Sequence, residues 1–220
     1  ISLEMSELMY AKRISTKVTN IPISDLRDSS SLVKDKVNAY KMSHEKSKLI
    51  IKEFPPNAIT VNQLNAYLKK LTNKGIVPDM VVLDYINLLH SPIGNNSYER
   101  IKHTSEQVRA LSYTYKCPFV TATQINRSGL NEQNPGVENI SESIGLAATA
   151  DCIMSIWQEE GDTELGVIRL GMVKNRYGQN FGSCTMAIDY TTLSLTQMQQ
   201  IINTEEADVV DEAFSMLQDD

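Results

Sequence analysis

The pattern of apolar and polar positions predicts that helices dominate the first part of the chain. Apolar residues recur at helical spacing over 6–18, 30–45 and 61–73. Ser6 and Thr60 precede the apolar positions of the first and third segments, where a side-chain oxygen can accept a hydrogen bond from the first turn. We therefore predict three amphipathic helices, two of them capped by these hydroxyl groups.

Largely apolar runs at 80–89 and 119–124 predict two strands buried on both faces. A helical pattern lies between them, and strand, helix, strand is the order that joins parallel neighbours. Residues 1–3 have the character of a strand end, and 48–54 of a further short strand. These features indicate a parallel sheet.

Three strand-like segments close the pattern, at 151–157, 165–174 and 183–190, with short connections between them. A short helix from Ser141 to Ala148 precedes them. Strands so close in sequence are expected to pair as hairpins that finish the sheet. The predicted fold class is therefore α/β, a mostly parallel twisted sheet flanked by helices, with antiparallel strands toward the C-terminal end.

Charge divides the chain into two parts. The 220 residues are 41% hydrophobic and carry a net charge of -6, which excludes a uniformly basic chain that coats nucleic acid. Residues 204–220 hold seven of the acids and no Lys or Arg, so the remainder is close to neutral. We predict one domain over 1–203, and an acidic tail over 204–220 whose apolar residues dock onto a partner or stay solvated.

Cysteine usage and hydropathy indicate a cytoplasmic protein. Cys117, Cys152 and Cys184 lie in apolar runs without metal-ligand spacing, so we expect buried free thiols and no zinc. No apolar run reaches the length of a membrane span.

Polar residues end three of the predicted parallel strands, where α/β sheets bind ligands. Asp84 is suited to hold Mg²⁺ beside phosphates, and the Gln124 amide to contact both a water and a terminal phosphate. Glu4 is suited to act as a general base if its strand lies beside the other two. Taken singly, each is more often simply a polar residue that ends a strand.

Lys174 and Arg176 stand two apart on a strand-like segment, which directs both cations to one side. This pair is suited to clamp phosphate, including phosphate bound by a neighbouring subunit. The alternative is that the two charges protect a sheet edge from pairing with other chains.

Five blocks in order, ISLEMS, VVLDYINLL, TATQINRSG, ADCIMSI and VKNRYG, resemble the C-terminal RecA-like motor domain of DnaB-type hexameric replicative helicases. The family pattern is close to SLEM, DYLQL, QLNRS, ADLIM and KQRNG. The resemblance runs from Ile1 to about Tyr190 and is strongest to the helicases of T-even-type bacteriophages, which would place the protein in the host cytoplasm.

The resemblance implies a role for each of these residues, with ATP and Mg²⁺ as cofactors. Glu4 would be the catalytic base, Asp84 the Walker B carboxylate on the magnesium side, and Gln124 the sensor of the γ-phosphate. Lys174 and Arg176 would reach the γ-phosphate of a neighbouring subunit, which requires a homo-hexameric ring.

The resemblance also implies single-stranded DNA as a ligand, with a primase and a helicase loader as partners. Arg127, Ser128, Glu142 and Ser143 fall in the segments that contact DNA in the family. The family pattern there is close to LRESGS, whereas this chain reads NISESIG, so only Glu142 and Ser143 align.

The sequence contains no GxxxxGK[ST] phosphate loop. In the family this loop precedes SLEM, so we expect it, with the first strand, to lie before residue 1, and we expect the 220 residues alone to be inactive. Two alternatives remain, a RecA-like strand-exchange or regulatory ATPase and a partner-binding module without activity of its own.

Overall fold

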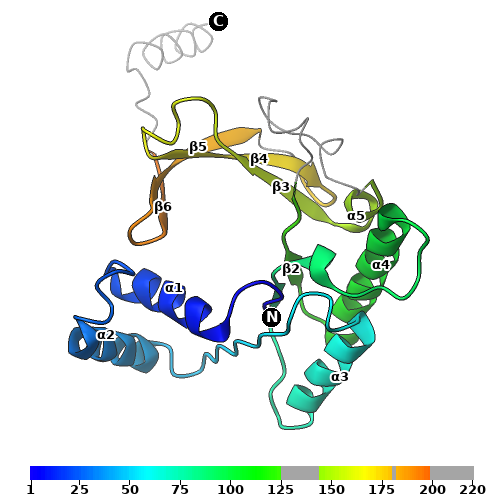
Figure 1. The fold of residues 1–220 in the computed structure, drawn as a ribbon, viewed down its shortest axis with the longest axis horizontal. Coiled ribbons are helices and arrows are strands. Elements are labelled where there is room, and N and C mark those ends of the chain that lie inside the picture. Colours follow the sequence, from blue (N-terminus) through cyan, green and yellow to red (C-terminus); the bar gives the residue numbers. More distant parts are fainter. Residues whose placement is uncertain (125–143, 180–181, 199–220) are drawn as a thin grey trace, which may run out of the picture.

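The computed structural model describes residues 1–124, 144–179 and 182–198, and Figure 1 labels most of its elements. The helices in these ranges are α1 (Glu7–Thr19), α2 (Ser30–Ser43), α3 (Val61–Thr72), the 3-10 helix η1 (Ile86–Leu88), α4 (Ser97–Tyr115) and α5 (Ile144–Thr149). The strands are β1 (Val81–Leu83), β2 (Phe119–Thr121), β3 (Cys152–Trp157), β4 (Val167–Asn175), β5 (Ser183–Asp189) and β6 (Ser194–Gln197). The predicted order of helices and strands is therefore largely confirmed.

Two helices begin at the residues that the sequence predicts. The Ser6 hydroxyl accepts a hydrogen bond from the backbone N–H of Met9 at 3.2 Å and caps α1. Thr60 and Gln63 each bond the other's backbone N–H through their side chains, a capping box at the start of α3. Both caps satisfy N–H groups that have no partner inside the helix, which fixes where the helix starts.

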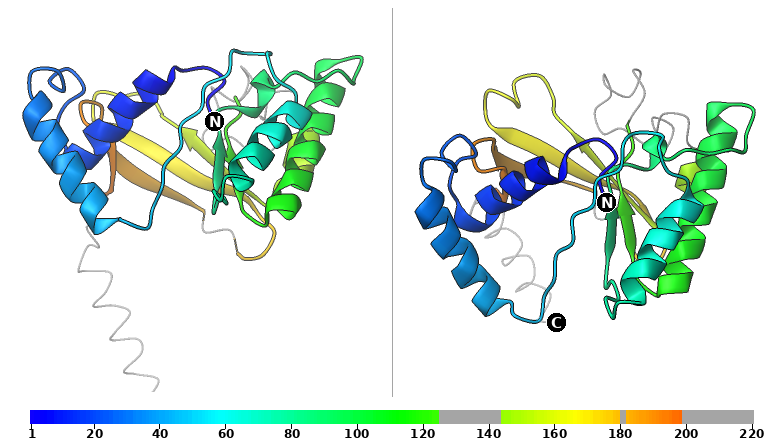
Figure 2. Two further views of the ribbon diagram at one scale, coloured as in Figure 1. Left: turned by 90° about the horizontal axis from the view of Figure 1, so that it is seen from below. Right: turned by 60° about the horizontal axis from the view of Figure 1, so that its bottom comes forward.

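The strands form two sheets rather than the single sheet predicted. β1 and β2 pair in parallel, while β3, β4, β5 and β6 form a separate antiparallel sheet in which neighbours in sequence are neighbours in space. Short connections favour this pairing, because consecutive antiparallel strands need only a tight turn. Figure 2 shows α3 and α4 beside β1 and β2, and α1 and α2 on the other side of the molecule.

Residues 1–3 extend the parallel sheet beyond β1. The backbone N–H of Leu3 donates to the carbonyl of Asp84 at 2.7 Å, and that of Asp84 donates to the carbonyl of Ile1 at 2.9 Å. On the other edge, Ser2 forms a parallel bridge to Glu53. The segment 48–54 is therefore not the predicted strand, because its only sheet-like pairing in the described part of the chain is this one bridge.

The apolar run at 80–89 is a strand only as far as Leu83. Its partner β2 ends at Thr121, whose hydroxyl accepts a hydrogen bond from the backbone N–H of Ile86 at 3.0 Å and donates to the carbonyl of Leu83 at 2.8 Å. After Leu83, hydrogen bonds to the Thr121 side chain thus take the place of backbone bonds between the strands, and the chain continues as η1.

The hydrophobic core lies between the parallel strands and helices α3 and α4. Leu3, Leu64 and Leu83 are almost completely buried there, with other apolar side chains of these elements around them. Val82 and Val120 point away from this core and are 51% and 48% exposed, so the prediction that both faces of these strands are buried is wrong. One face packs on helices, and within the described residues the other is largely open.

The prediction of buried free thiols holds for one of the three cysteines. All three cysteines are free, but only Cys117 is buried, because Cys152 and Cys184 lie on exposed faces of the antiparallel sheet. Among the helices that the structure describes, none is long and apolar enough to cross a membrane.

Candidate active site

Three predicted site residues lie at the same end of neighbouring parallel segments. Glu4 follows the segment that pairs with Asp84, Asp84 follows β1, and Gln124 comes shortly after β2. Because parallel segments end at the same edge of a sheet, the backbone pairing brings these three residues to one edge. The segment before Glu4 lies beside β1 through the bridge of Ser2 to Asp84, and β1 in turn pairs with β2, so the condition set for Glu4 is met for one of the two strands.

Tyr10 of α1 contacts the Asp84 carboxylate, and the sequence analysis missed it. Its hydroxyl donates a hydrogen bond to Asp84 Oδ2. Partial burial, together with this hydrogen bond, raises the pKa of Tyr10 to about 12, so the hydroxyl remains a donor at neutral pH. The only signal in the sequence is that Tyr10 lies shortly after the Ser6 cap, close behind Glu4.

A tight turn places Glu4 at the surface. The hydroxyl of Ser2 accepts from the backbone N–H of Met5 at 3.0 Å and donates to the carbonyl of Met5 at 2.6 Å. Glu4 lies within this turn and is exposed. Its carboxylate is therefore accessible to water, as a general base for a water molecule must be.

The segment after Asp84 is connected to the end of β2 by side chains. Gln124 Nε2 donates to the hydroxyl of Tyr85 at 3.3 Å, and Thr123 donates to Asn87 Oδ1 at 3.0 Å. Gln124 is thus bonded to the residue that directly follows Asp84, and it is itself exposed. These contacts couple the position of one strand end to that of the other.

The carboxylate of Asp84 is suited to Mg²⁺ rather than to a metal that needs several protein ligands. No group of three or more His, Cys, Asp or Glu side chains gathers around a point within residues 1–124, 144–179 and 182–198. Mg²⁺ keeps several waters and takes one or two carboxylates together with substrate phosphates. The donors at this edge are compatible with Mg²⁺ that arrives with a nucleotide.

The cations Lys174 and Arg176 lie on the antiparallel sheet, apart from the three strand ends. Lys174 Nζ donates to the carbonyl of Ala147 at 2.8 Å, and Arg176 Nη2 donates to that of Ala148 at 3.3 Å. Both side chains therefore reach the C-terminal end of α5, as their spacing of two predicts. Arg176 Nη1 also donates to Asp151 Oδ1 at 2.6 Å.

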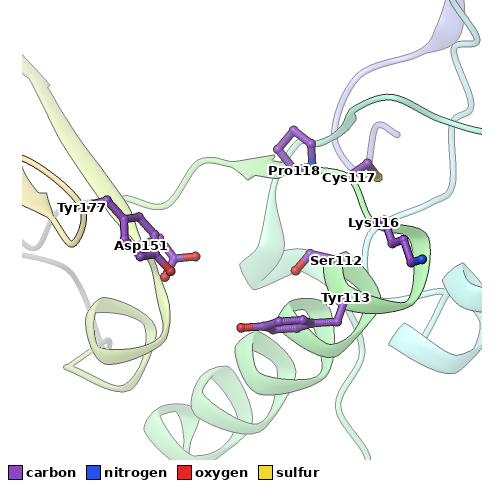
Figure 3. Close-up of a pocket in the computed structure, with 7 residues that line it drawn as sticks. All are labelled: Ser112, Tyr113, Lys116, Cys117, Pro118, Asp151 and Tyr177. Carbon is purple, nitrogen blue, oxygen red and sulfur yellow. The ribbon is translucent and has the colours of Figure 1, made fainter.

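A cavity of about 360 Å³ lies beside this cation cluster. Figure 3 shows Asp151 and Tyr177 on one side of it, and Ser112, Tyr113 and Lys116 of the α4 end on the other. A second cavity of about 360 Å³ is lined by residues of η1 and the start of α4. Neither of these two cavities is lined by Glu4, Asp84 or Gln124.

The other predicted site residues lie outside the described residues. These are the candidate DNA contacts Arg127, Ser128, Glu142 and Ser143. The acidic tail over 204–220 also lies there, and the boundary at 203 stays a prediction.

The fold is that of a RecA-like ATPase domain. The family model described as "DnaB-like helicase C terminal domain" matches residues 1–197, and the chain belongs to this family. The family predicted from the five sequence blocks is thereby confirmed.

Individual relatives are replicative helicases of phage and plasmid origin. The chain is similar to the "DnaB-like replicative helicase" of Enterobacteria phage T4, with 28% identity over 186 residues, which cover 81% of this chain and 39% of that protein. It is also similar to a "Probable plasmid replicative DNA helicase" of Chlamydia trachomatis, with 26% identity over 191 residues, 83% of this chain and 40% of that protein. The chain thus spans less than half the length of these curated relatives.

Two solved structures share the fold. One is described as a DnaB-like replicative helicase and its interactions with primase, with a TM-score of 0.73, 20% identity, and coverage of 90% of this chain and 49% of that chain. The other is described as an ATPase domain, with a TM-score of 0.74, 18% identity, and coverage of 90% of this chain and 73% of that chain. These likenesses confirm the predicted RecA-like fold class.

Proposed function

We propose that this chain is the larger part of the motor domain of a replicative DNA helicase, which couples ATP hydrolysis to movement along single-stranded DNA and to duplex unwinding. One observation carries the proposal: Glu4, Asp84 and Gln124 end adjacent parallel segments, while the cations Lys174 and Arg176 lie on another sheet. Membership of the helicase family supports the same function.

Each strand-end residue would have a separate role at the terminal phosphate of the nucleotide. Asp84 would hold Mg²⁺, which neutralises charge that develops on the transferred phosphoryl group. Glu4 would accept a proton from the attacking water, which its exposure allows. The Gln124 amide would contact the terminal phosphate. Through its hydrogen bond to the Tyr85 hydroxyl, loss of the phosphate would shift Tyr85 and the segment that follows it.

The cations would act on a neighbouring subunit. Lys174 and Arg176 bond the end of α5 and Asp151, apart from the strand ends, so they need a second copy of the chain to reach a phosphate bound at Asp84. A ring provides this arrangement at every interface, and a homo-hexamer is the assembly implied by the family resemblance. Charge from an arginine supplied in this way accelerates phosphoryl transfer strongly.

Partners follow from the same proposal. Single-stranded DNA would pass through the ring in the cytoplasm, and a primase and a loader would bind the assembled helicase. The solved structure of a protein with this fold, described with its interactions with primase, supports primase as a partner.

Substitution of the proposed base tests the proposal. In the full-length protein, Glu4→Gln should retain ATP binding and ring assembly and lose DNA-stimulated hydrolysis and unwinding, because the amide cannot accept the proton of water. Glu45→Gln is the matched control, since it removes the same charge from an exposed turn away from the site. Wild-type hydrolysis by Glu4→Gln would contradict the assigned role.

An assay on a forked DNA duplex distinguishes a helicase from a strand-exchange ATPase. A forked duplex with a single-stranded tail should be unwound in the presence of ATP and Mg²⁺, and no pairing of homologous strands should be seen. Strand exchange without unwinding would favour the alternative.

A further inference from the structure

Asp151 joins two arginines through a single oxygen. Its Oδ1 accepts from Arg176 Nη1 at 2.6 Å and from Arg109 Nη1 at 3.0 Å. The backbone carbonyl of Asp151 also accepts from the backbone N–H of Arg176 at 2.8 Å. One residue therefore holds both the backbone and the side chain of Arg176.

Both arginines, together with Lys174, donate hydrogen bonds to the C-terminal end of α5. The carbonyls of Ala147, Ala148 and Thr149 accept hydrogen bonds from Lys174, Arg176 and Arg109, in that order. These are carbonyls of the last turn, which carry partial negative charge and attract cations. The helix end is thus fixed by three positive side chains, one from α4 and two from the end of β4.

Helix α5 itself is packed closely on α4. A Cβ atom added at Gly145 would lie 2.7 Å from Cβ of Lys102, so only glycine allows this approach. The close contact sets the position of the carbonyls at the other end of α5. It therefore also sets the position of the acceptors for Arg176.

Arg176 keeps donors for a ligand in this arrangement. Its bonds to Asp151 and Ala148 use two of the five N–H groups of a guanidinium. The side chain is 38% exposed, and we expect the donors that these two bonds leave over to be available to an incoming phosphate.

We propose that Asp151 is a positioning residue for Arg176. The inference rests on the proposed role of Arg176 at the phosphate of a neighbouring subunit. Asp151 separates two guanidinium groups that would otherwise repel each other, and it directs the free donors of Arg176 outward. Without its charge, Arg109 and Arg176 would move apart, and Arg176 would meet the phosphate in many orientations.

A stability role does not account for this contact. Asp151 is 43% exposed, and ion pairs at such positions contribute little to the free energy of folding. Asp151→Asn keeps the shape and the acceptor oxygen and removes only the charge. The variant is therefore expected to fold and to form rings.

The test measures steady-state ATP hydrolysis by full-length rings on single-stranded DNA. For Asp151→Asn we expect kcat to fall about 10- to 100-fold, by analogy with the loss seen when a residue that orients a metal ligand is replaced. KM for ATP should stay unchanged, and Asp151→Glu should recover part of kcat. Glu159→Gln is the control. Glu159 lies in the loop before β4 and forms an ion pair with Arg169, so the substitution also removes one carboxylate from an arginine, but at the other end of the strand from Arg176.

A double substitution separates positioning from structure. If Asp151 acts through Arg176, adding Asp151→Asn to Arg176→Ala should cause no further loss, because the positioned group is already absent. Multiplied losses, or wild-type kcat in Asp151→Asn, would overturn this inference alone. Wild-type turnover by Arg176→Ala would overturn the trans role itself, and the inference with it.

Discussion

The two sheets hold their functional groups by different means. In the parallel part, backbone ladders next to a buried core place the strand ends, and Leu3 and Leu83 beneath them are 0% and 1% exposed. In the antiparallel part, exposed side-chain bonds place the cations, and apolar residues such as Met154 and Ile156 are 58% and 57% exposed.

This difference separates a fixed half of the site from an adjustable one. Backbone ladders beside a core open only with much of the fold, whereas exposed ion pairs contribute little to the free energy of folding and depend on single side chains such as Asp151. In the proposed mechanism, Glu4, Asp84 and Gln124 orient water and metal, which the first arrangement favours. The proposed approach of Lys174 and Arg176 to the phosphate of another subunit is favoured by the second.

The largest expected effect is on the adjustable half. In the full-length protein, Arg176→Ala should lower DNA-stimulated ATP turnover by about 10³-fold, as loss of an arginine finger does, while ATP binding and ring assembly remain. Turnover and equilibrium nucleotide binding are measured on the same rings.

Mixed rings decide whether Arg176 serves its neighbour. Activity should fall faster than the fraction of Arg176→Ala subunits if each one disables the site next to it. A decline in simple proportion to that fraction would place the action of Arg176 within its own subunit.

Stability should depend mainly on the fixed half. Leu83→Ala leaves a cavity in the core and should lower the free energy of unfolding by about 2–5 kcal/mol. Ile156→Ala, on an exposed strand face, should change it by no more than about 0.5 kcal/mol. Urea unfolding measures both. Equal losses would show that β3 is covered as fully as β1.

The two halves should lose stability at opposite ends of the pH range. Burial, with the hydrogen bond to Asp84, raises the pKa of Tyr10 from 10.0 to about 12. Hydrogen bonds from Thr192 and Thr191 lower the pKa of Asp189 from 3.8 to about 2. The Tyr10 contribution is therefore present below pH 10 and lost as pH rises to 12, whereas the Asp189 contribution is present above pH 3.8 and lost as pH falls to 2.

Thermal unfolding across pH measures both effects. Tyr10→Phe should flatten the decline in Tm at alkaline pH and leave the acid limb unchanged, and Asp189→Asn should do the reverse. Both effects should be small, because Asp189 is exposed and Tyr10 is only partly buried. A change in Tm at acid pH for Tyr10→Phe, or at alkaline pH for Asp189→Asn, would contradict the assignment of these two groups.

Local signals predicted the helices well and the sheets less well. Ser6 and Thr60 cap helices because their oxygens bond N–H groups three residues away, which a sequence displays directly. The failure at 48–54 has a long-range cause, since Glu53 bridges to Ser2 and no strand of the described residues covers its other side. The split into two sheets likewise depends on which distant strands meet.

The candidate site was predictable where its residues end strands. Glu4, Asp84 and Gln124 were found because each follows an apolar run and matches a family block. Tyr10 and Asp151 were missed, because their roles come from contacts with residues 74 and 25 positions away. Asp151 does stand in the block ADCIMSI, but the sequence does not reveal that its partner is Arg176.

The ladder between residues 1–3 and β1 also has a consequence for how the chain folds. The nitrogen of Ile1 donates to the carbonyl of Val82, 81 positions away, whereas the antiparallel strands pair with their neighbours in sequence. Contacts between distant residues form slowly because the intervening chain must first lose its freedom. The antiparallel meander is therefore expected to form early, and the strand ends that carry Glu4 and Asp84 to come together last.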